Sequence, residues 1–260
     1  MSRKLIDVGN GFWNIRGSFK IAGLIDIGTQ ISLIQRANGK FVFLDSYTLS
    51  DDLAAEIEQI TGGSEHIEAI LNLHPFHTMH VQAMHQRYPK ARLHGTARHV
   101  ERFADLPWHD LRTEHKKLHS RYADDLEFAI PAGVDFISDN QNIHFSSVLA
   151  LHKASQTIHS DDTLMFMRLP LPLRLLGKPD RLSWHPTLSQ ALEKKAGAAA
   201  EFRDWASGLI EQWRGAQNLC AAHTAPLLAS NNAGKSIAER MQQALDRVES
   251  TLRAHERRYG

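Results

Sequence analysis

Cysteine is almost absent from this chain: one residue, Cys220, stands among 260. A single thiol excludes an internal disulfide and any metal cluster built from several thiolates, and it fits a reducing compartment. Net charge is almost absent as well, since 30 lysines and arginines oppose 29 aspartates and glutamates, which gives +1. No global field therefore recruits nucleic acid or an anionic membrane, and we expect neither as a partner.

Long apolar runs are also missing. Residues 1–7 form no apolar stretch of signal-peptide length, and the longest apolar patch, residues 164–176, is broken by arginines and prolines. No segment offers the roughly 20 apolar residues that span a bilayer. We therefore expect a cytoplasmic protein. The Gly-x-Ser-x-Gly turn of many serine hydrolases is absent too, which disfavours a serine–histidine–aspartate triad.

Histidine is the residue in excess, with 16 copies. His74, His77 and His80 follow the short apolar run 70–73, which has the composition of a buried strand. Imidazole is the commonest metal-ligating side chain in proteins, and a strand end holds the backbone of such ligands still. The stretch 70–80 therefore predicts a metal site. The alternative interpretation is a chance cluster in a histidine-rich chain.

Strand and helix signals alternate along the first part of the chain. Short runs rich in β-branched and aromatic residues fill residues 4–45, and Asn38-Gly39 marks a hairpin between two of them. We expect helices over 50–60 and 81–88, and strands over 70–73 and 91–94. This order predicts a partly parallel sheet with helices packed on it.

The second part of the chain has weaker signals. Residues 98–125 are polar and carry four histidines, which we interpret as belonging to a surface loop. We expect strands over 134–138, 143–152, 156–159 and 218–222, a mostly helical segment over 186–214, and an amphipathic helix over 233–258. The arginines of that last helix are interpreted as a solvated face, with a homodimer contact as the alternative.

These elements, in this order, resemble the metallo-β-lactamase superfamily. The resemblance rests on a β-rich start ending at Leu44-Asp45, a helix, the histidine-bearing strand end, a helix leading into Tyr88–His94, Asp161-Asp162 before an apolar run, and a late strand ending in His223. It covers residues 5–228. It implies an α/β fold, the αββα sandwich of two mixed β-sheets flanked by helices, formed by residues 1–230. Residues 231–260 would be a C-terminal helical extension packed on it.

The superfamily's His-x-His-x-Asp-His motif is degenerate in this chain. In the best register His77 and His80 take the second and third histidine positions, Pro75 stands at the first, and Met79 stands at the aspartate. Proline offers no ligand, and methionine is a poor ligand for a hard divalent ion. The chain is therefore most similar to a divergent branch of the superfamily, and we expect one metal ion instead of two.

The resemblance implies a set of site residues. The expected metal ligands are His77, His80, His152, Asp162 and His223, and Asp162 and His80 are also the expected catalytic residues. Asp45, His74 and His159 are expected to orient those ligands. His159 stays open as the alternative to His152, and Asp161 as the alternative to Asp162.

The implied activity is hydrolysis of a small ester, thioester, lactone or phosphoester by a metal-bound hydroxide. The expected ion is zinc, with iron or manganese as alternatives. A bound ion depresses the pKa of its water toward ~7, which supplies hydroxide at neutral pH. A small-molecule substrate is the expected partner. One alternative is a non-catalytic binding or scaffold protein, which Pro75 and Met79 favour. Another is an iron-binding redox protein of the same fold.

Overall fold

Two compact units share the chain, and the computed structural model describes residues 4–21, 25–26, 28–168, 180–223, 225–232 and 234–260. The first unit is drawn from residues up to 128 together with 152–155, and the second from residues 129–151 and 156–260. Each unit has its own cluster of buried apolar side chains. The chain therefore passes from one unit to the other more than once.

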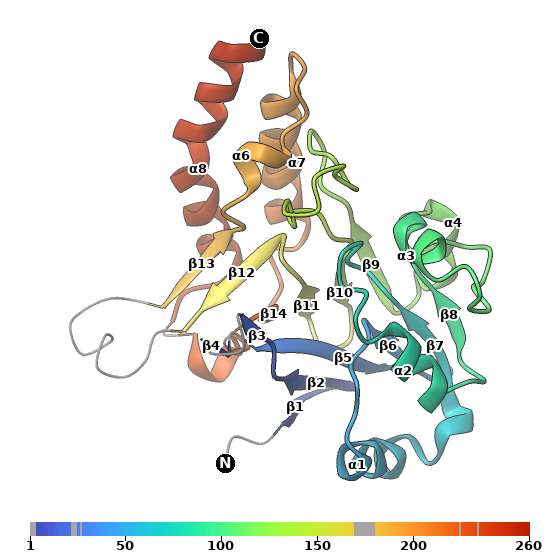
Figure 1. Ribbon diagram of the computed structural model, residues 1–260. Helices are drawn as coiled ribbons and strands as arrows, with labels where there is room; N and C mark the ends of the chain where they lie inside the picture. The colour runs from blue at the N-terminus through green and yellow to red at the C-terminus, as the bar shows by residue number, and fades with distance from the viewer. Residues whose placement is uncertain (1–3, 22–24, 27, 169–179, 224, 233) are drawn as a thin grey trace. The chain divides into compact units, whose positions relative to one another are not determined.

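The first unit is built on a six-stranded sheet with the order β1-β2-β5-β6-β7-β8 (Figure 1). Its elements are β1 (Leu5–Gly9), β2 (Phe12–Gly17), β3 (Lys20–Ile21), β4 (Ile25–Asp26), β5 (Thr29–Gln35), β6 (Phe41–Leu44), α1 (Asp51–Thr61), the 3₁₀ turn η1 (Ser64–His66), β7 (Ile67–Leu71), α2 (Val81–Arg87), β8 (Arg92–His94), α3 (Ala97–Arg102) and α4 (Lys116–Arg121). Strands β1, β2, β5 and β6 pair antiparallel, whereas β6, β7 and β8 pair in parallel. The predicted mixed sheet is confirmed.

The core of the first unit follows one row of paired residues across this sheet. Leu33, Phe43, Ile70 and Leu93 are successive partners on β5 to β8, and all four are buried. Buried side chains of α1 and α2 belong to the same cluster. The row therefore packs against these two helices, as expected when crossover helices cover a parallel sheet.

The second unit contains a four-stranded sheet with the order β14-β11-β10-β9 and a separate two-stranded sheet formed by β12 and β13. Its elements are β11 (Thr157–Ser160), β12 (Leu164–Met167), β13 (Arg181–Trp184), α6 (Leu188–Ala191), α7 (Ala198–Gln212), β14 (Asn218–Ala221), the 3₁₀ turn η2 (Ala229–Asn231) and α8 (Ile237–Tyr259). The strands β9 (Leu126–Ala129) and β10 (Leu149–His152) straddle the division between the units. Strands β11 and β14 are parallel.

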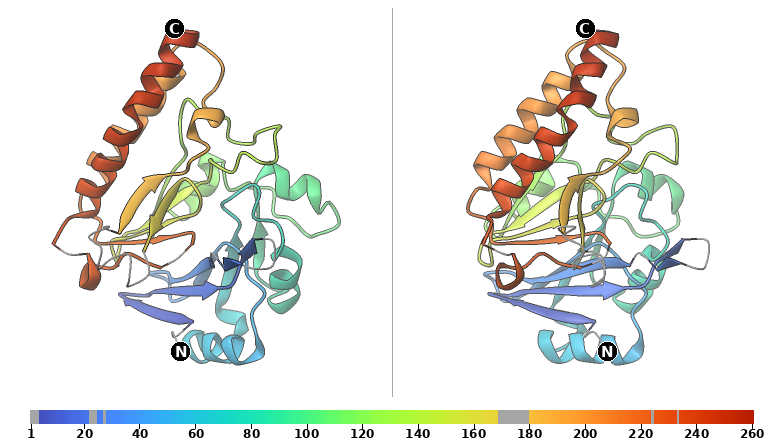
Figure 2. Two further views of the ribbon diagram at one scale, coloured as in Figure 1. Left: turned by 60° about the vertical axis from the view of Figure 1, so that its left-hand side comes forward. Right: turned by 90° about the vertical axis from the view of Figure 1, so that its left-hand side faces the viewer.

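Helices α7 and α8 of the second unit run side by side (Figure 2). The buried face of α8 consists of Ile237, Met241, Leu245 and Leu252, which the helical periodicity of the sequence predicts, together with Ala244 and His255. On the partly exposed side, the guanidinium of Arg203 on α7 contacts carboxylates of α8 at 3.0 Å and 2.8 Å. The terminal helix thus packs within the second unit, where its apolar stripe is covered.

Helix α8 begins with a capping box. The Ser236 hydroxyl accepts a hydrogen bond from the Glu239 N–H at 3.1 Å, and the Glu239 carboxylate accepts one from the Ser236 N–H at 2.7 Å. We expect Ser236→Ala to lower the free energy of unfolding by about 1 kcal/mol, because an N–H at the helix start loses its acceptor. Urea denaturation followed by circular dichroism measures this change. Ser236→Asp, which keeps an acceptor, should stay within a few tenths of wild type, and equal losses in both variants would contradict the capping role.

The segment 186–214 is mostly helical, as expected, but in two helices: the chain leaves α6 after Ala191 and enters α7 after Gly197, whose φ of +82° is left-handed. Two expectations about secondary structure are wrong. No strand forms over 134–138, where Val134 makes only a single bridge to Leu192. The surface loop expected over 98–125 contains α3 and α4 and buries His99 completely. In each case, contacts distant in sequence override the local pattern.

Among the described residues, no helix combines the length and apolarity needed to cross a membrane.

Candidate metal centre

Asp45 fixes the backbone from which the histidine-bearing turn leaves the sheet. The backbone N–H of Asp45 donates to the Leu71 carbonyl at 2.8 Å, and the Asp45 carboxylate accepts from the Leu73 N–H at 2.7 Å. Asp45 is buried and takes a positive φ of +67°. This conformation is strained for residues other than glycine, and such residues cluster at functional sites. Its carboxylate therefore acts first on the main chain, directly before His74.

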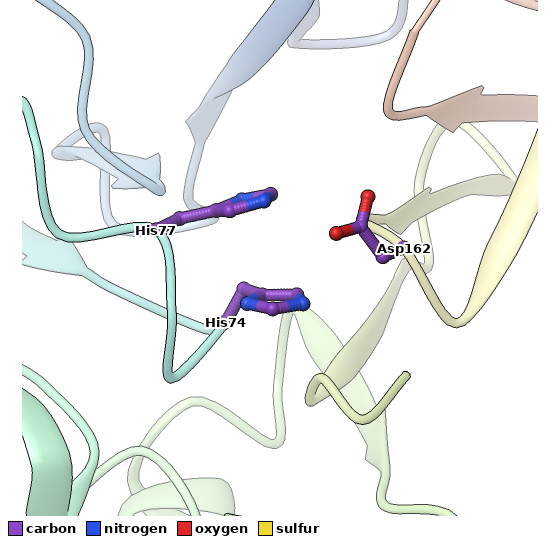
Figure 3. A group of neighbouring side chains, drawn as sticks. All are labelled: His74, His77 and Asp162. Carbon is purple, nitrogen blue, oxygen red and sulfur yellow. The ribbon is translucent and has the colours of Figure 1, made fainter. Parts of the chain in front are cut away.

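His74 and His77 lie on one tight turn beyond β7. The His77 N–H donates to the His74 carbonyl at 3.1 Å, and the two imidazole rings stack with centroids 4.0 Å apart (Figure 3). The His74 Nδ1 accepts a hydrogen bond from the Phe76 N–H at 3.1 Å. In a neutral His74 ring this leaves the proton on Nε2. His74 and His77 each offer one ring nitrogen that could bind a metal ion.

His80 belongs to the same turn. It is the N-cap residue of α2, its Nδ1 lies 2.8 Å from the Thr48 hydroxyl, and its ring packs on Tyr47. Burial lowers the pKa of His80, and the neighbouring His77 lowers it further. An imidazole that stays neutral at pH 7 is the form that binds a metal ion. His80 thus follows His74 and His77 on the same turn, and its role as a metal ligand stays a prediction.

His152 lies elsewhere in the first unit. Its Nδ1 is 2.9 Å from the Ser155 hydroxyl, its ring packs on Phe12, and burial lowers its pKa. Within this unit His152 joins no group with the histidines of the 74–80 turn. The sequence places it at a strand end that resembles a ligand position, but its ring is used in packing at the end of β10.

The second unit brings Asp162 and His223 together. Ser160 of β11 and Ala221 of β14 are paired in parallel strands, so the residues that follow both strands emerge at the same edge of the sheet. The His223 Nε2 lies 3.2 Å from one Asp162 carboxylate oxygen, and His223 takes a positive φ of +67°. Asp162, drawn in Figure 3, therefore has beside it the imidazole of His223, which that figure does not draw.

Two neighbours of this pair complete the description of the second unit. His144, which the sequence analysis did not single out, has its Nδ1 3.9 Å from the other Asp162 oxygen. Asp161 is buried, and His159 is buried on β11 opposite Cys220 of β14. Within this unit Asp162 lies beside His223 and His144, and Asp161 lies near His159, so the choice between the two aspartates stays open.

The available donors fit a divalent transition-metal ion. The 74–80 turn offers imidazole nitrogens, and the edge beyond β11 and β14 offers one carboxylate with an imidazole; both kinds of donor bind zinc, iron or manganese. Met79, at the motif's aspartate position, is 72% exposed, and its thioether is not turned into the core with the histidines. The number of bound ions stays a prediction.

His99 braces the turn and was missed by the sequence analysis. Its Nδ1 contacts the Thr96 hydroxyl at 2.9 Å, and its Nε2 lies 3.3 Å from the His77 carbonyl. Burial lowers the pKa of His99 to about 4, so the ring is neutral at pH 7. One sequence signal could have found it: Thr96 stands three residues before His99, which is the spacing of a capping box. In a capping box each of the two side chains bonds to the backbone N–H of the other residue.

A second buried histidine predicts how stability depends on pH. Burial lowers the pKa of His94 to about 4, below the ordinary value of about 6.5. The unfolded chain therefore takes up the proton first, and stability present above pH 6.5 is lost as the pH falls toward 4. The loss from this residue approaches about 3 kcal/mol. We expect His94→Gln to show a flatter fall in unfolding free energy between pH 7 and 4.5 than wild type, measured by urea denaturation. The exposed His115→Gln should keep the wild-type slope; an unchanged slope in His94→Gln would contradict the assignment.

Solved metallo-β-lactamases share the architecture of this chain. A metallo-β-lactamase from Erythrobacter litoralis aligns with a TM-score of 0.60 and 10% identity, over 94% of this chain and 96% of that one. One from Pontibacter korlensis aligns with a TM-score of 0.55 and 10% identity, over 93% and 98%. FIM-1 from Pseudomonas aeruginosa, in its mono-zinc form, aligns with a TM-score of 0.55 and 12% identity, over 94% and 95%.

The comparison of sequences finds no counterpart. No protein-family model matches the chain, and no curated protein matches it significantly. At the low identities above, structural likeness establishes the fold alone. The chain has the metallo-β-lactamase fold, as its pattern of elements predicts.

Proposed function

We propose that this protein is a metal-dependent hydrolase of a small ester, thioester, lactone or phosphoester. The observation that carries the proposal is the metallo-β-lactamase fold over more than nine tenths of the chain, combined with imidazole and carboxylate donors directly after strand ends in both units. A bound ion would activate water and polarise the scissile carbonyl or phosphoryl group. Zinc is the proposed ion, and a small molecule the proposed partner.

The residues of the chain have separate roles in this proposal. His77 and His80 are the proposed metal ligands of the first unit, and Asp162 and His223 are the proposed metal ligands of the second. His74 and His99 would position His77, the first through the ring stack and the second through the His77 carbonyl. The loss of a proposed ligand from either unit should therefore lower metal binding.

Chelator-sensitive hydrolysis tests this function. The purified chain is assayed with p-nitrophenyl acetate, a thioester, a lactone, bis-p-nitrophenyl phosphate and a chromogenic β-lactam, before and after dipicolinate treatment and zinc addition. We expect hydrolysis of at least one probe that the chelator abolishes and zinc restores. Asp162→Asn should lower that rate at least about 100-fold, since it removes a donor and its charge. Asp124→Asn, a change at an exposed carboxylate, should not.

A non-catalytic binding or scaffold protein with this fold is the second candidate. Pro75 and the exposed Met79 at motif positions favour it, because neither supplies a ligand in that register. Stoichiometric metal with no hydrolysis of any probe would favour this candidate over the enzyme. Iron with a redox-dependent visible absorbance would favour the third alternative, a redox protein.

A further inference from the structure

A cavity of about 530 Å³ opens in the first unit at the edge where its parallel strands begin. Lys40 directly precedes β6, Glu68 is the second residue of β7, and Arg92 is the first residue of β8. Because these three strands are parallel, their amino ends meet at one edge of the sheet. The 74–80 turn follows the carboxyl end of β7, so the cavity and the histidines belong to opposite edges of the same sheet.

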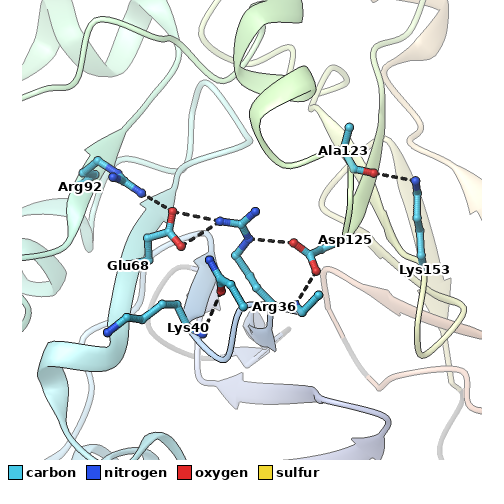
Figure 4. A network of polar contacts seen from close by, with 9 residues as sticks. Arg36, Lys40, Glu68, Arg92, Ala123, Asp125 and Lys153 are labelled. Atoms are coloured by element: carbon cyan, nitrogen blue, oxygen red, sulfur yellow. Dashed lines mark hydrogen bonds and ion pairs between the residues drawn. The ribbon is translucent and has the colours of Figure 1, made fainter.

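Ion pairs connect the groups at the floor of this cavity. The Arg36 side chain is only 10% exposed, donates to the Asp125 carboxylate at 2.8 Å, and donates to both Glu68 oxygens at 2.8 Å and 3.0 Å (Figure 4). The Arg36 guanidinium also lies over the Tyr122 ring, 4.9 Å from its centroid. Arg92 contacts the same Glu68 carboxylate. Ionic partners on two sides hold these groups in one arrangement before any ligand arrives.

The cavity carries an excess of positive charge. Five cations line it, against the two lining carboxylates of Glu65 and Glu68. With Asp125 behind Arg36 counted as well, five positive charges oppose three negative ones, an excess of two. Within the described part of the chain, Lys40, Lys90 and Arg121 pair with no carboxylate, and the contact of Arg121 is with the His109 ring at 3.5 Å. The carboxylate of Glu68 already pairs with Arg36 and Arg92, and the carboxylate of Asp125 already pairs with Arg36.

We propose that this cavity is a binding site for a small polyphosphate anion. Ammonium groups attract phosphate as point charges, and a guanidinium offers it paired donors. A volume of about 530 Å³ lies in the range of small-molecule sites. An anion bound by Lys40, Lys90 and Arg121 would neutralise charges that have no carboxylate partner among the described residues. The proposal is independent of hydrolysis, because it uses the other edge of the sheet.

Calorimetric titration with inorganic tripolyphosphate tests the site on the full chain, stripped of metal and at low ionic strength. The pocket variant is Lys40→Ala, Lys90→Ala and Arg121→Ala combined. The matched control is Lys117→Ala, Lys235→Ala and Arg257→Ala combined, which removes the same charge from exposed positions. We expect binding at the wild-type level in the control and at least tenfold weaker binding in the pocket variant. Tripolyphosphate also chelates metal ions, so His77→Ala is included as a second control. This variant should bind tripolyphosphate as tightly as the wild type does.

The outcomes separate cleanly. No binding to the wild type, an unchanged affinity in the pocket variant, or equal losses in the pocket and control variants would overturn the proposal. Binding lost in His77→Ala and retained in the pocket variant would overturn it too, and would place the anion at the histidines. If thermal unfolding shows that the triple pocket variant is misfolded, Lys90→Glu replaces it. That exposed single change should weaken binding at least fivefold, and an unchanged affinity would contradict the site.

Discussion

Replacing Gly133 with alanine is expected to lower the free energy of unfolding by about 3–5 kcal/mol, the combined cost of a left-handed backbone and a forced overlap. Gly133 has a φ of +70°, and a Cβ atom there would lie 2.1 Å from the Ala198 carbonyl oxygen and 2.9 Å from the Phe202 nitrogen. Both neighbours are backbone atoms of α7, so no side-chain rotation can relieve the overlap. The start of α7 would have to move away from residue 133.

Gly197 provides the matched control for this prediction. Its φ of +82° is equally left-handed, yet a Cβ atom there meets nothing within 4 Å. Gly197→Ala should therefore cost only the backbone strain, about 1–2 kcal/mol. Urea denaturation of the two variants, followed by circular dichroism, measures the difference. Equal losses would show that the contact with α7 adds nothing to the conformational cost.

His77→Ala is expected to lower the affinity of the chain for zinc roughly 100-fold or more, because even residues that only support a ligand contribute 10- to 100-fold. Elemental analysis of protein purified without a histidine tag measures the metal content, and competition with a chromophoric chelator measures the affinity. We expect near-stoichiometric metal in the wild type. His223→Ala should show a comparable loss, although it changes the other unit.

His115→Ala is the control for metal binding. His115 is exposed, and its Nδ1 accepts only a local backbone hydrogen bond from Arg112. Its loss should leave the metal content unchanged. A wild type that retains no metal after zinc is added back would end the hydrolase proposal, whereas metal lost in His77→Ala alone would confine the ions to the first unit.

The histidine-bearing turn could be predicted because its signal is local. The run 70–73, followed by a proline and three histidines, specifies a strand end, and β7 ends at Leu71, two residues before the predicted end. The terminal helix was equally accessible, since a stripe of apolar residues at helical spacing over 23 residues is typical of an amphipathic helix. Both predictions depend on neighbours in sequence, where periodicity carries the information.

Other features depend on contacts that no local pattern encodes. His99 lies in a polar segment, but hydrogen bonds to Thr96 and to the His77 carbonyl draw it into the interior. His144 comes close to Asp162 although 18 positions separate them, because the intervening chain returns through β10 and β11. His152 is the opposite case, because the local pattern places it correctly at a strand end. Its Nδ1, however, contacts the Ser155 hydroxyl, and its ring packs on Phe12.

The return of residues 152–155 to the first unit has a consequence for synthesis on the ribosome. The Lys153 N–H donates to the Asp125 carbonyl at 3.0 Å, and its ammonium donates to the Ala123 carbonyl at 2.6 Å, so this short segment ties down the end of the first unit (Figure 4). It leaves the exit tunnel only after residues 129–151, which belong to the second unit, have already emerged. A nascent chain paused near residue 130 therefore lacks four residues of a unit whose other residues are all present. The first unit can therefore complete its folding only after residues 129–151 of the second unit have emerged from the ribosome.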